Sequence, residues 1–209
     1  MTNQQIMKTF QRPPTLVTGR LTLRRMLPSD DADMYEYACL PEVTEYLLWS
    51  PHPSREHTRR YLEMIQGNYK RGEFFDWAIV LTAGGKMIGT CGFTCLEPDH
   101  RRAEVGYVLN PAYWGRGLAP EAVMAAEEFA FRELGMNRVE AHFMQGNDRS
   151  LRVMQKCGMT LEGYLQQYMF VKGQYRTIGI AAITRDRFRA SGCYRRAEEK
   201  KGFRLFGGT

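Results

Sequence analysis

A strand, a glycine-containing turn and a helix follow one another between Glu104 and Ala122, and this order constrains the fold more than any other feature. The run 105–109 predicts a buried strand that Asn110-Pro111 ends. Gly115 and Gly117 then precede a helix with Pro120 in its first turn, where a missing N–H leaves no helical bond unmade. Unpaired backbone N–H groups and the positive end of a helix dipole converge there, which favours a phosphate or pyrophosphate.

Two common phosphate-binding loops do not match this segment. A Walker-type loop needs Lys-Ser or Lys-Thr after its glycines, and a dinucleotide-binding fold needs GxGxxG directly after the strand. Here five residues, 110–114, precede the first glycine, and no glycine stands at the position of the third. Glu140 lies at the distance of a ribose-binding acid, but it stands between Val139 and Ala141 and is expected to face solvent.

The order of the other elements predicts an α/β fold. Apolar periodicity and turn residues indicate helices over about 30–39, 54–69, 120–134 and 147–157. They indicate strands over about 21–25, 74–81, 87–96, 103–109, 139–143, 165–171 and 175–183. We therefore expect a mixed central sheet of about seven strands covered by about four helices. One domain is expected over 18–184, with a flexible lead-in over 1–17 and a basic C-terminal extension over 185–209.

Composition excludes several classes of protein. No apolar stretch of the 209 residues approaches the ~20 needed to cross a bilayer, and the first residues lack an apolar signal core. We therefore expect a cytoplasmic protein with no membrane partner. The five cysteines are scattered and never spaced as a metal-binding pair, so no disulfide framework and no metal are expected.

The net charge of +6 is concentrated at one end of the chain. Residues 185–209 contain eight Lys/Arg and three Asp/Glu, so they carry five of these six charges. The remaining body is nearly neutral. Nucleic acid is therefore not an expected partner, although aromatic residues interleave with the basic residues of the tail.

Three segments resemble the GNAT superfamily of acyl-CoA-dependent N-acyltransferases. The segment 114–119 with Glu121-Ala122, preceded by 104–107, is similar to that family's acetyl-CoA pyrophosphate loop, although Trp114 stands where Gln or Arg is common. The segments 20–24 and 147–163 are similar to the branch that acetylates ribosomal-protein N-termini. The resemblance covers about residues 18–184. It implies the GNAT fold, acetyl-CoA as cosubstrate and an amine acceptor, and we expect a monomer or a homodimer.

The resemblance also implies roles for particular residues in cofactor binding. The backbone N–H groups of the turn would hold the CoA pyrophosphate, and these residues are Trp114, Gly115, Arg116, Gly117, Leu118 and Ala119. Val108 and Leu109 would bind the pantetheine arm through their backbone, which requires an unpaired strand edge. Asn147 and Ser150 would contact the cofactor from the next helix.

Two residues are candidates for catalysis. Glu104 would act as the base, directly or through a water, and its alternative is an exposed strand residue. Many relatives place an acidic tyrosine where this chain has Met154, so Ser150 would assist the departing thiolate, and its alternative is a serine that starts a helix. A glutamate base of the ribosomal-protein branch appears as Met169 here, which weakens the transfer of that branch's substrate chemistry.

The acceptor is expected to be a protein N-terminal amine. Such an amine has a pKa near 8 and needs a weaker base than lysine, whose pKa is near 10.4. A small-molecule amine and a catalytically silent CoA-binding module remain as alternatives. The segment 46–54 is the candidate lid, and an acceptor pocket could be lined by Tyr46, Trp49, His52, Phe75, Trp77 and Tyr168. For each of these residues taken singly, core packing or a surface loop is the preferred reading.

Overall fold

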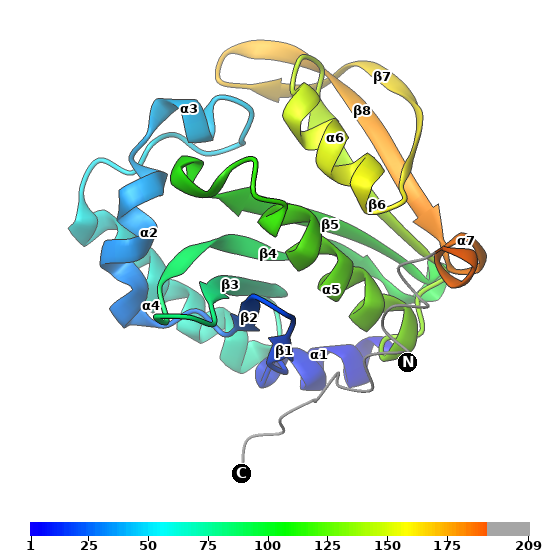
Figure 1. Ribbon diagram of the computed structural model, residues 1–209, viewed down its shortest axis with the longest axis horizontal. Helices are drawn as coiled ribbons and strands as arrows, with labels where there is room; N and C mark the ends of the chain where they lie inside the picture. Colours follow the sequence, from blue (N-terminus) through cyan, green and yellow to red (C-terminus); the bar gives the residue numbers. More distant parts are fainter. Residues whose placement is uncertain (192–209) are drawn as a thin grey trace.

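Figure 1 shows the computed structural model, which describes residues 1–191. Eight strands of this range form one sheet in the order β1-β2-β3-β4-β5-β6-β8-β7. Every neighbouring pair is antiparallel except β5 and β6, which run parallel. The strands are β1 (Leu16–Val17), β2 (Leu21–Arg24), β3 (Asp76–Leu81), β4 (Met87–Glu97), β5 (Arg102–Leu109), β6 (Arg138–Met144), β7 (Thr160–Val171) and β8 (Gln174–Thr184).

Helices cover both faces of the sheet (Figure 1). They are α1 (Asn3–Gln11), α2 (Asp31–Ala38), α3 (Pro41–Thr44), α4 (Arg55–Arg71), α5 (Leu118–Arg132), α6 (Asp148–Lys156) and α7 (Arg185–Ala190). Local signals set the ends of the longest one, since Ser54 caps α4 by accepting the N–H of His57 and Gly72 ends it at φ 70°. In residues 1–191, no helix combines the length and apolar character that a membrane span needs.

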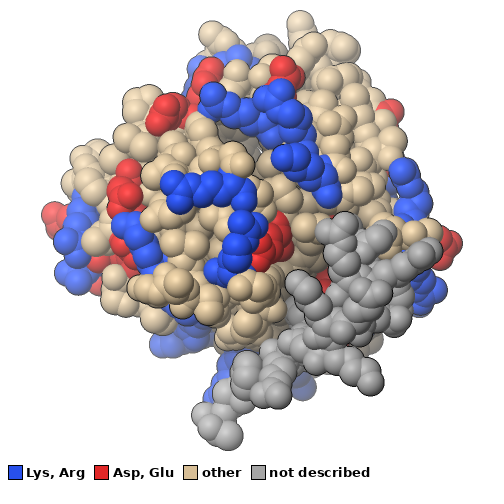
Figure 2. All heavy atoms as spheres, viewed as in Figure 1, with Lys and Arg blue, Asp and Glu red and all other residues tan. Residues whose placement is uncertain are grey.

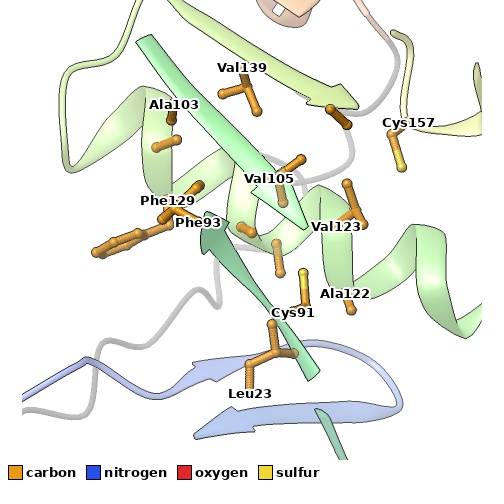
Figure 3. Close-up of a cluster of buried hydrophobic side chains, with 14 of the residues drawn as sticks. Leu23, Cys91, Phe93, Ala103, Val105, Ala122, Val123, Phe129, Val139 and Cys157 are labelled. Atoms are coloured by element: carbon orange, nitrogen blue, oxygen red, sulfur yellow. The ribbon is translucent and has the colours of Figure 1, made fainter. Parts of the chain in front are cut away.

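Two apolar layers stabilise the domain. The larger lies between the sheet and the helices α5 and α6, and Figure 3 shows Val105 and Val139 of the parallel strands facing Val123 and Phe129 of α5. The smaller lies on the opposite face, between the sheet and the helices α2 and α4. Side chains alternate along β5, so one strand contributes to both layers and its ends are held in place from both sides.

The expected α/β architecture is confirmed, and the N-terminal segment corrects the expectation of a loose lead-in. Residues 1–17 contain α1 and the short strand β1, with Thr2 and Gln5 forming a capping box. Ile6 and Phe10 are buried in the larger core. The helix forms because these two apolar residues lie four apart and so share one helical face.

The cysteines and the C-terminal extension were also sequence predictions. Cys91 and Cys157 are buried, Cys39 and Cys95 are half-buried, and none of these four described cysteines forms a disulfide. In the extension, α7 packs its Phe188 on Phe131 of α5 with ring centroids 4.8 Å apart. Residues 192–209 of the predicted basic extension, which include Cys193, lie outside the described residues.

One buried carboxyl group is out of place in this core. Glu127 lies on α5 with no exposed surface, and neither carboxylate oxygen has a hydrogen-bond partner within residues 1–191. Burial raises the pKa of this group well above its ordinary value of 4.5. The folded protein therefore keeps a proton that the unfolded chain releases, and the free energy of unfolding falls as pH rises above 4.5, by up to about 1.4 kcal/mol per pH unit.

We expect Glu127→Gln to remove this loss of stability. In urea denaturation at pH 4.5 to 8, the unfolding free energy of the variant minus that of the wild type should increase as pH rises. Glu63→Gln on the exposed side of α4 is the matched control and should show no such trend. A constant difference between Glu127→Gln and the wild type at every pH would contradict the prediction.

Candidate active site

The two parallel strands of the sheet separate along their length. β5 and β6 are paired only from Arg102–Glu104 to Arg138–Glu140, and no pairing follows within the described range. Beyond Glu104 the edge of β5 is therefore open toward β6 through Leu109. The cleft between the diverging strands, called the fork below, provides the unpaired strand edge that the sequence required.

The direction of the backbone decides which residues can bind a ligand at this edge. Asn110 donates its N–H to Ile88 of β4 at 2.8 Å, so by alternation Val108 also faces β4. This corrects the expectation of a backbone contact from Val108, whose side chain alone can reach the ligand. Tyr107 and Leu109 face the fork, and the carbonyl of Leu109 already accepts Trp114 Nε1 at 2.8 Å.

The turn before α5 presents its backbone at the open end of the fork. Gly115 has φ 75° and Gly117, the N-cap of α5, has φ 72°, a region that glycine occupies without strain. The N–H groups of the first turn of α5 point out of the helix end, where the dipole favours negative charge. This geometry agrees with the anion site expected from the sequence.

An ion pair between Arg20 and Glu121 holds this turn on the side of β2. Glu121 on α5 accepts the backbone N–H of Arg20 at 2.9 Å and binds its guanidinium at 2.6 Å. The same guanidinium donates to the carbonyl oxygens of Arg116 at 3.0 Å and Gly117 at 3.3 Å. With these carbonyls held on the side of β2, the turn keeps its N–H groups directed to the other side.

A cavity of about 870 Å³ connects the turn, the β5 edge and α6. Nine of the predicted cofactor residues line it: Val108, Leu109, Trp114, Gly115, Gly117, Leu118, Ala119, Asn147 and Ser150. Arg116 does not line it, because its side chain lies over the ring of Tyr113 at 5.3 Å. Glu104 also lies outside the lining, at the closed end of the fork.

Basic side chains of α6 form a wall that the sequence analysis did not identify. Arg149, Arg152 and Lys156 line the cavity, and Figure 2 shows blue side chains of this region gathered around a hollow. Their spacing of three and four residues places them on one face of a helix, which could have been recognised from the sequence. Arg149 also lies over the ring of Trp114 at 4.7 Å. Together with the helix end, this wall suits a ligand with several phosphates.

Ser150 is connected to a tyrosine of β5. Its hydroxyl lies 2.8 Å from Tyr107 Oη, and the backbone N–H of Ser150 donates to Asn147 Oδ1 at 3.2 Å. Burial raises the pKa of Tyr107, so its hydroxyl stays protonated near neutral pH. Met154 is buried in the core. Tyr107 of β5 therefore places a phenol group beside Ser150 in the cavity, and the sequence alone did not predict this contact.

Glu104 belongs to a group of charges on the sheet face opposite α5. It accepts a hydrogen bond from Thr94 Oγ1 at 2.8 Å and lies 3.4 Å from His142 Nδ1. Glu140 was expected to face solvent but is buried, because Arg102 and Arg138 bind its two oxygens at 3.2 and 2.7 Å. Burial opposes ionisation of Glu140, but the contact with His142 and the hydrogen bond from Arg138 outweigh it and lower its pKa to about 2.

The same group of side chains bears on metal binding. Donor atoms of Glu104, Glu140 and His142 lie within 4.8 Å of one another. Arg102 and Arg138 already compensate Glu140, so this arrangement is an ion-pair network rather than a cage for a cation.

The expected acceptor pocket is only partly assembled. Tyr46 lines the cavity and reaches Gly146 after β6, and Lys172 at the β7–β8 turn donates to the carbonyl of Thr44 at 2.5 Å. The start of the candidate lid thus forms part of the cavity wall. Trp49 and His52 instead pack beside α4, with ring centroids 5.3 Å apart.

Two aromatic residues of β3 and the segment before it belong to the core rather than to a pocket. Trp77 is fully buried, and its Nε1 donates to the carbonyl of Pro14 at 2.8 Å. Phe75 packs edge-on against Phe10 of α1 with ring centroids 4.9 Å apart. Both were candidates for an acceptor pocket, with core packing or a surface loop as the preferred reading of each, and they pack in the core where α1 covers this end of the sheet.

Comparisons with known proteins agree with the geometry. Residues 20–160 match the family model described as an acetyltransferase (GNAT) domain. The chain is 34% identical over 160 residues to the uncharacterized N-acetyltransferase p20 of Bacillus licheniformis, covering 77% of this chain and 90% of that protein. It is 27% identical to a [ribosomal protein uS5]-alanine N-acetyltransferase of Escherichia coli, covering 81% and 90% of the two chains. A GNAT-family acetyltransferase structure from Bacillus anthracis superposes with TM-score 0.74 at 26% identity, covering 82% and 99%.

Proposed function

This chain belongs to the GNAT family of acetyl-CoA-dependent N-acetyltransferases, and we propose that it acetylates a peptide N-terminal amine through the fork between β5 and β6. The observation that carries the proposal is the single cavity surface that joins the end of α5, the open edge of β5 and Ser150. A family resemblance alone would leave the location of the reaction open.

The proposed cofactor position follows the charges of this surface. The pyrophosphate lies at the turn before α5, because the backbone N–H groups of residues 114–119 converge there. Arg149, Arg152 and Lys156 of α6 supply positive charge for the remaining phosphate. The pantetheine arm then runs along β5 and uses the backbone groups of Tyr107 that face the fork. This places the thioester near Ser150.

Both substrates are present together in the proposed reaction, so proximity supplies much of the acceleration. The amine nitrogen attacks the thioester carbon, the nitrogen–carbon bond forms, and the carbon–sulfur bond breaks. The nitrogen loses a proton, and the departing CoA thiolate gains one. Ser150 donates to the thiolate. Its hydroxyl lies 2.8 Å from Tyr107 Oη, which also donates to the backbone carbonyl of Ser150 at 2.9 Å and so fixes the position of Ser150.

Glu104 takes the proton of the amine in this proposal. It lies where β5 and β6 begin to diverge, on the face opposite α5, so an acceptor entering from that face meets Glu104 before it meets the thioester. The relative that acetylates the alanine of ribosomal protein uS5 favours a peptide N-terminus as this acceptor.

A screen of acceptors tests the proposal directly. Purified protein with acetyl-CoA should release CoA thiol when given peptides with a free N-terminus, and more slowly with N-blocked peptides that contain lysine. A polyamine and an amino sugar form the small-molecule arm. Preference for a small amine would overturn the peptide acceptor, and absence of amine-dependent release in every arm would favour a silent CoA-binding module.

We expect Glu104→Gln to lose more activity at pH 7 than at pH 9. Without the carboxylate, the reaction depends on amine that is already deprotonated in solution, and this fraction rises about tenfold per pH unit below the amine pKa. The pH–rate profile should therefore shift its rising limb to higher pH. Equal impairment at every pH would assign Glu104 to positioning, and unchanged activity would make it a solvent-facing strand residue.

A further inference from the structure

We infer that His142 accepts the proton of the acceptor amine by way of Glu104. Its ring lies between Glu104 and Glu140 at the closed end of the fork. The inference rests on the proposed function, because it extends the role of Glu104. It makes His142 a positioning and proton-holding residue that acts through Glu104, and it makes Glu140 the fixed negative charge beside it.

The position of His142 follows from the register of the parallel strands. Glu104 and Glu140 form the last pair before β5 and β6 diverge, and His142 lies two residues further along β6 on the same face. Its Nδ1 lies 3.4 Å from Glu104 Oε2 and its Nε2 lies 3.3 Å from Glu140 Oε1. The ring is 22% exposed, so it is shielded but keeps a path to water.

This geometry stabilises the imidazolium that forms when the neutral ring accepts a proton. A neutral imidazole has one N–H, so one ring nitrogen would direct a lone pair at a carboxylate oxygen. The imidazolium instead places a positive charge at ion-pair distance from both carboxylates. The contact of its Nε2 with Glu140 is the main cause that raises the pKa of His142 above 6.5, and the charge of Glu104 adds to it.

Four strands supply the charged and polar groups around His142. β5 supplies Glu104 and Arg102, and the latter opposes protonation of the ring. β6 supplies Glu140 and Arg138, and β7 supplies Glu162, which binds Arg138 at 2.6 Å. β4 supplies Thr94, whose hydroxyl donates to Glu104. Glu140 stays ionised because of the two arginines, so its charge is constant over the pH range in which His142 titrates.

A proton transfer to His142 compensates for the weak basicity of a carboxylate. A carboxylate is a weak base for an ammonium group of pKa 8 or above. If Glu104 passes the proton to His142 Nδ1, the amine loses its proton to an imidazole of higher pKa, and the imidazolium lies between two negative charges. The proton leaves to water when the ring returns to its neutral form, so proton balance closes in each turnover.

Three variants separate this role from a structural one in the pH dependence of kcat/KM. His142→Gln should lower kcat/KM at pH 7 by about 10²-fold, the range of a positioned acid–base group, and move the rising limb to higher pH. Glu140→Gln should move the limb in the opposite direction, because the ring loses the neighbour that raises its pKa. His100→Gln, on an exposed turn between β4 and β5, is the matched control and should follow the wild-type profile.

A direct titration tests His142 without using activity. The chain has four histidines, so the His142 ring signal can be assigned in an NMR spectrum by its loss in His142→Gln. We expect its midpoint above 6.5 in the wild type and a lower midpoint in Glu140→Gln. A wild-type midpoint at or below 6.5, or a His142→Gln pH profile equal to that of the wild type, would overturn the inference.

The outcomes also separate this inference from the proposed function. A wild-type protein that releases no CoA with any amine refutes the proposed function, whatever the NMR titration shows. Active wild type with an unaltered His142→Gln profile refutes only the role of His142. If Glu140→Gln does not fold, the wild-type midpoint and His142→Gln still decide the question.

Discussion

Gly117→Val should weaken acetyl-CoA binding by about 10²-fold or more while the protein stays folded. Gly117 adopts φ 72°, which costs a β-branched residue on the order of 1–3 kcal/mol. An added Cβ would meet only Arg20 Nη2, at 3.8 Å, so the substitution has space within the fold. Its methyl groups would project from the N-cap of α5, where the proposed pyrophosphate must approach the backbone closely.

Calorimetric titration of acetyl-CoA measures this effect, and a strain-matched variant controls for it. Gly85 lies in the β3–β4 turn with φ 68° and open space around its Cβ position. Gly85→Val should therefore lose similar stability but bind acetyl-CoA normally. Equal affinity of folded Gly117→Val and wild type would remove the turn before α5 from the cofactor site.

Ser150→Ala should lower kcat by about 10²-fold with little change in the KM for acetyl-CoA. The hydroxyl of Ser150 lies 2.8 Å from Tyr107 Oη, so its loss removes the donor proposed for the departing thiolate. Tyr107→Phe should lower kcat in the same direction but less, because Ser150 would still donate. Steady-state kinetics with the best acceptor measures both values.

The contrasting possibility is that Ser150 only helps α6 to begin. Ser54 is the matched control, because its hydroxyl caps α4 by accepting the N–H of His57 at 3.1 Å, away from the cavity. Ser54→Ala should lower the melting temperature by the loss of a cap, about 1 kcal/mol, and leave kcat unchanged. A Ser150→Ala protein that behaves like Ser54→Ala would assign Ser150 to helix initiation.

Long elements with strong periodic patterns could be predicted from the sequence. The helix expected over 54–69 is α4 (Arg55–Arg71), and the strand expected over 87–96 is β4 (Met87–Glu97). Apolar residues at a fixed period bury one face wherever the element lies in the fold, so this signal is local. The turn proposed to bind the pyrophosphate could be predicted for the same reason, since its glycines and the following helix are adjacent in the chain.

Short elements were not predicted. β1 and α3 have two and four residues, too few to show a period, and they exist because neighbouring elements hold them. α1 did carry a signal, the pair Thr2 and Gln5, but the polar composition of the segment obscured it. Its two apolar residues, Ile6 and Phe10, stabilise the helix only because they are buried in the larger core.

By itself, the sequence determined the α/β class, the order of the long elements and the turn before α5, because each depends on residues close in the chain. Only the tertiary structure decided which distant side chains meet. Ser150 meets Tyr107 across 43 positions, and His142 lies between Glu104 and Glu140 because β5 and β6 run parallel in one register. Such contacts depend on strand order and on the point where two strands separate, and neither is encoded in any local spacing.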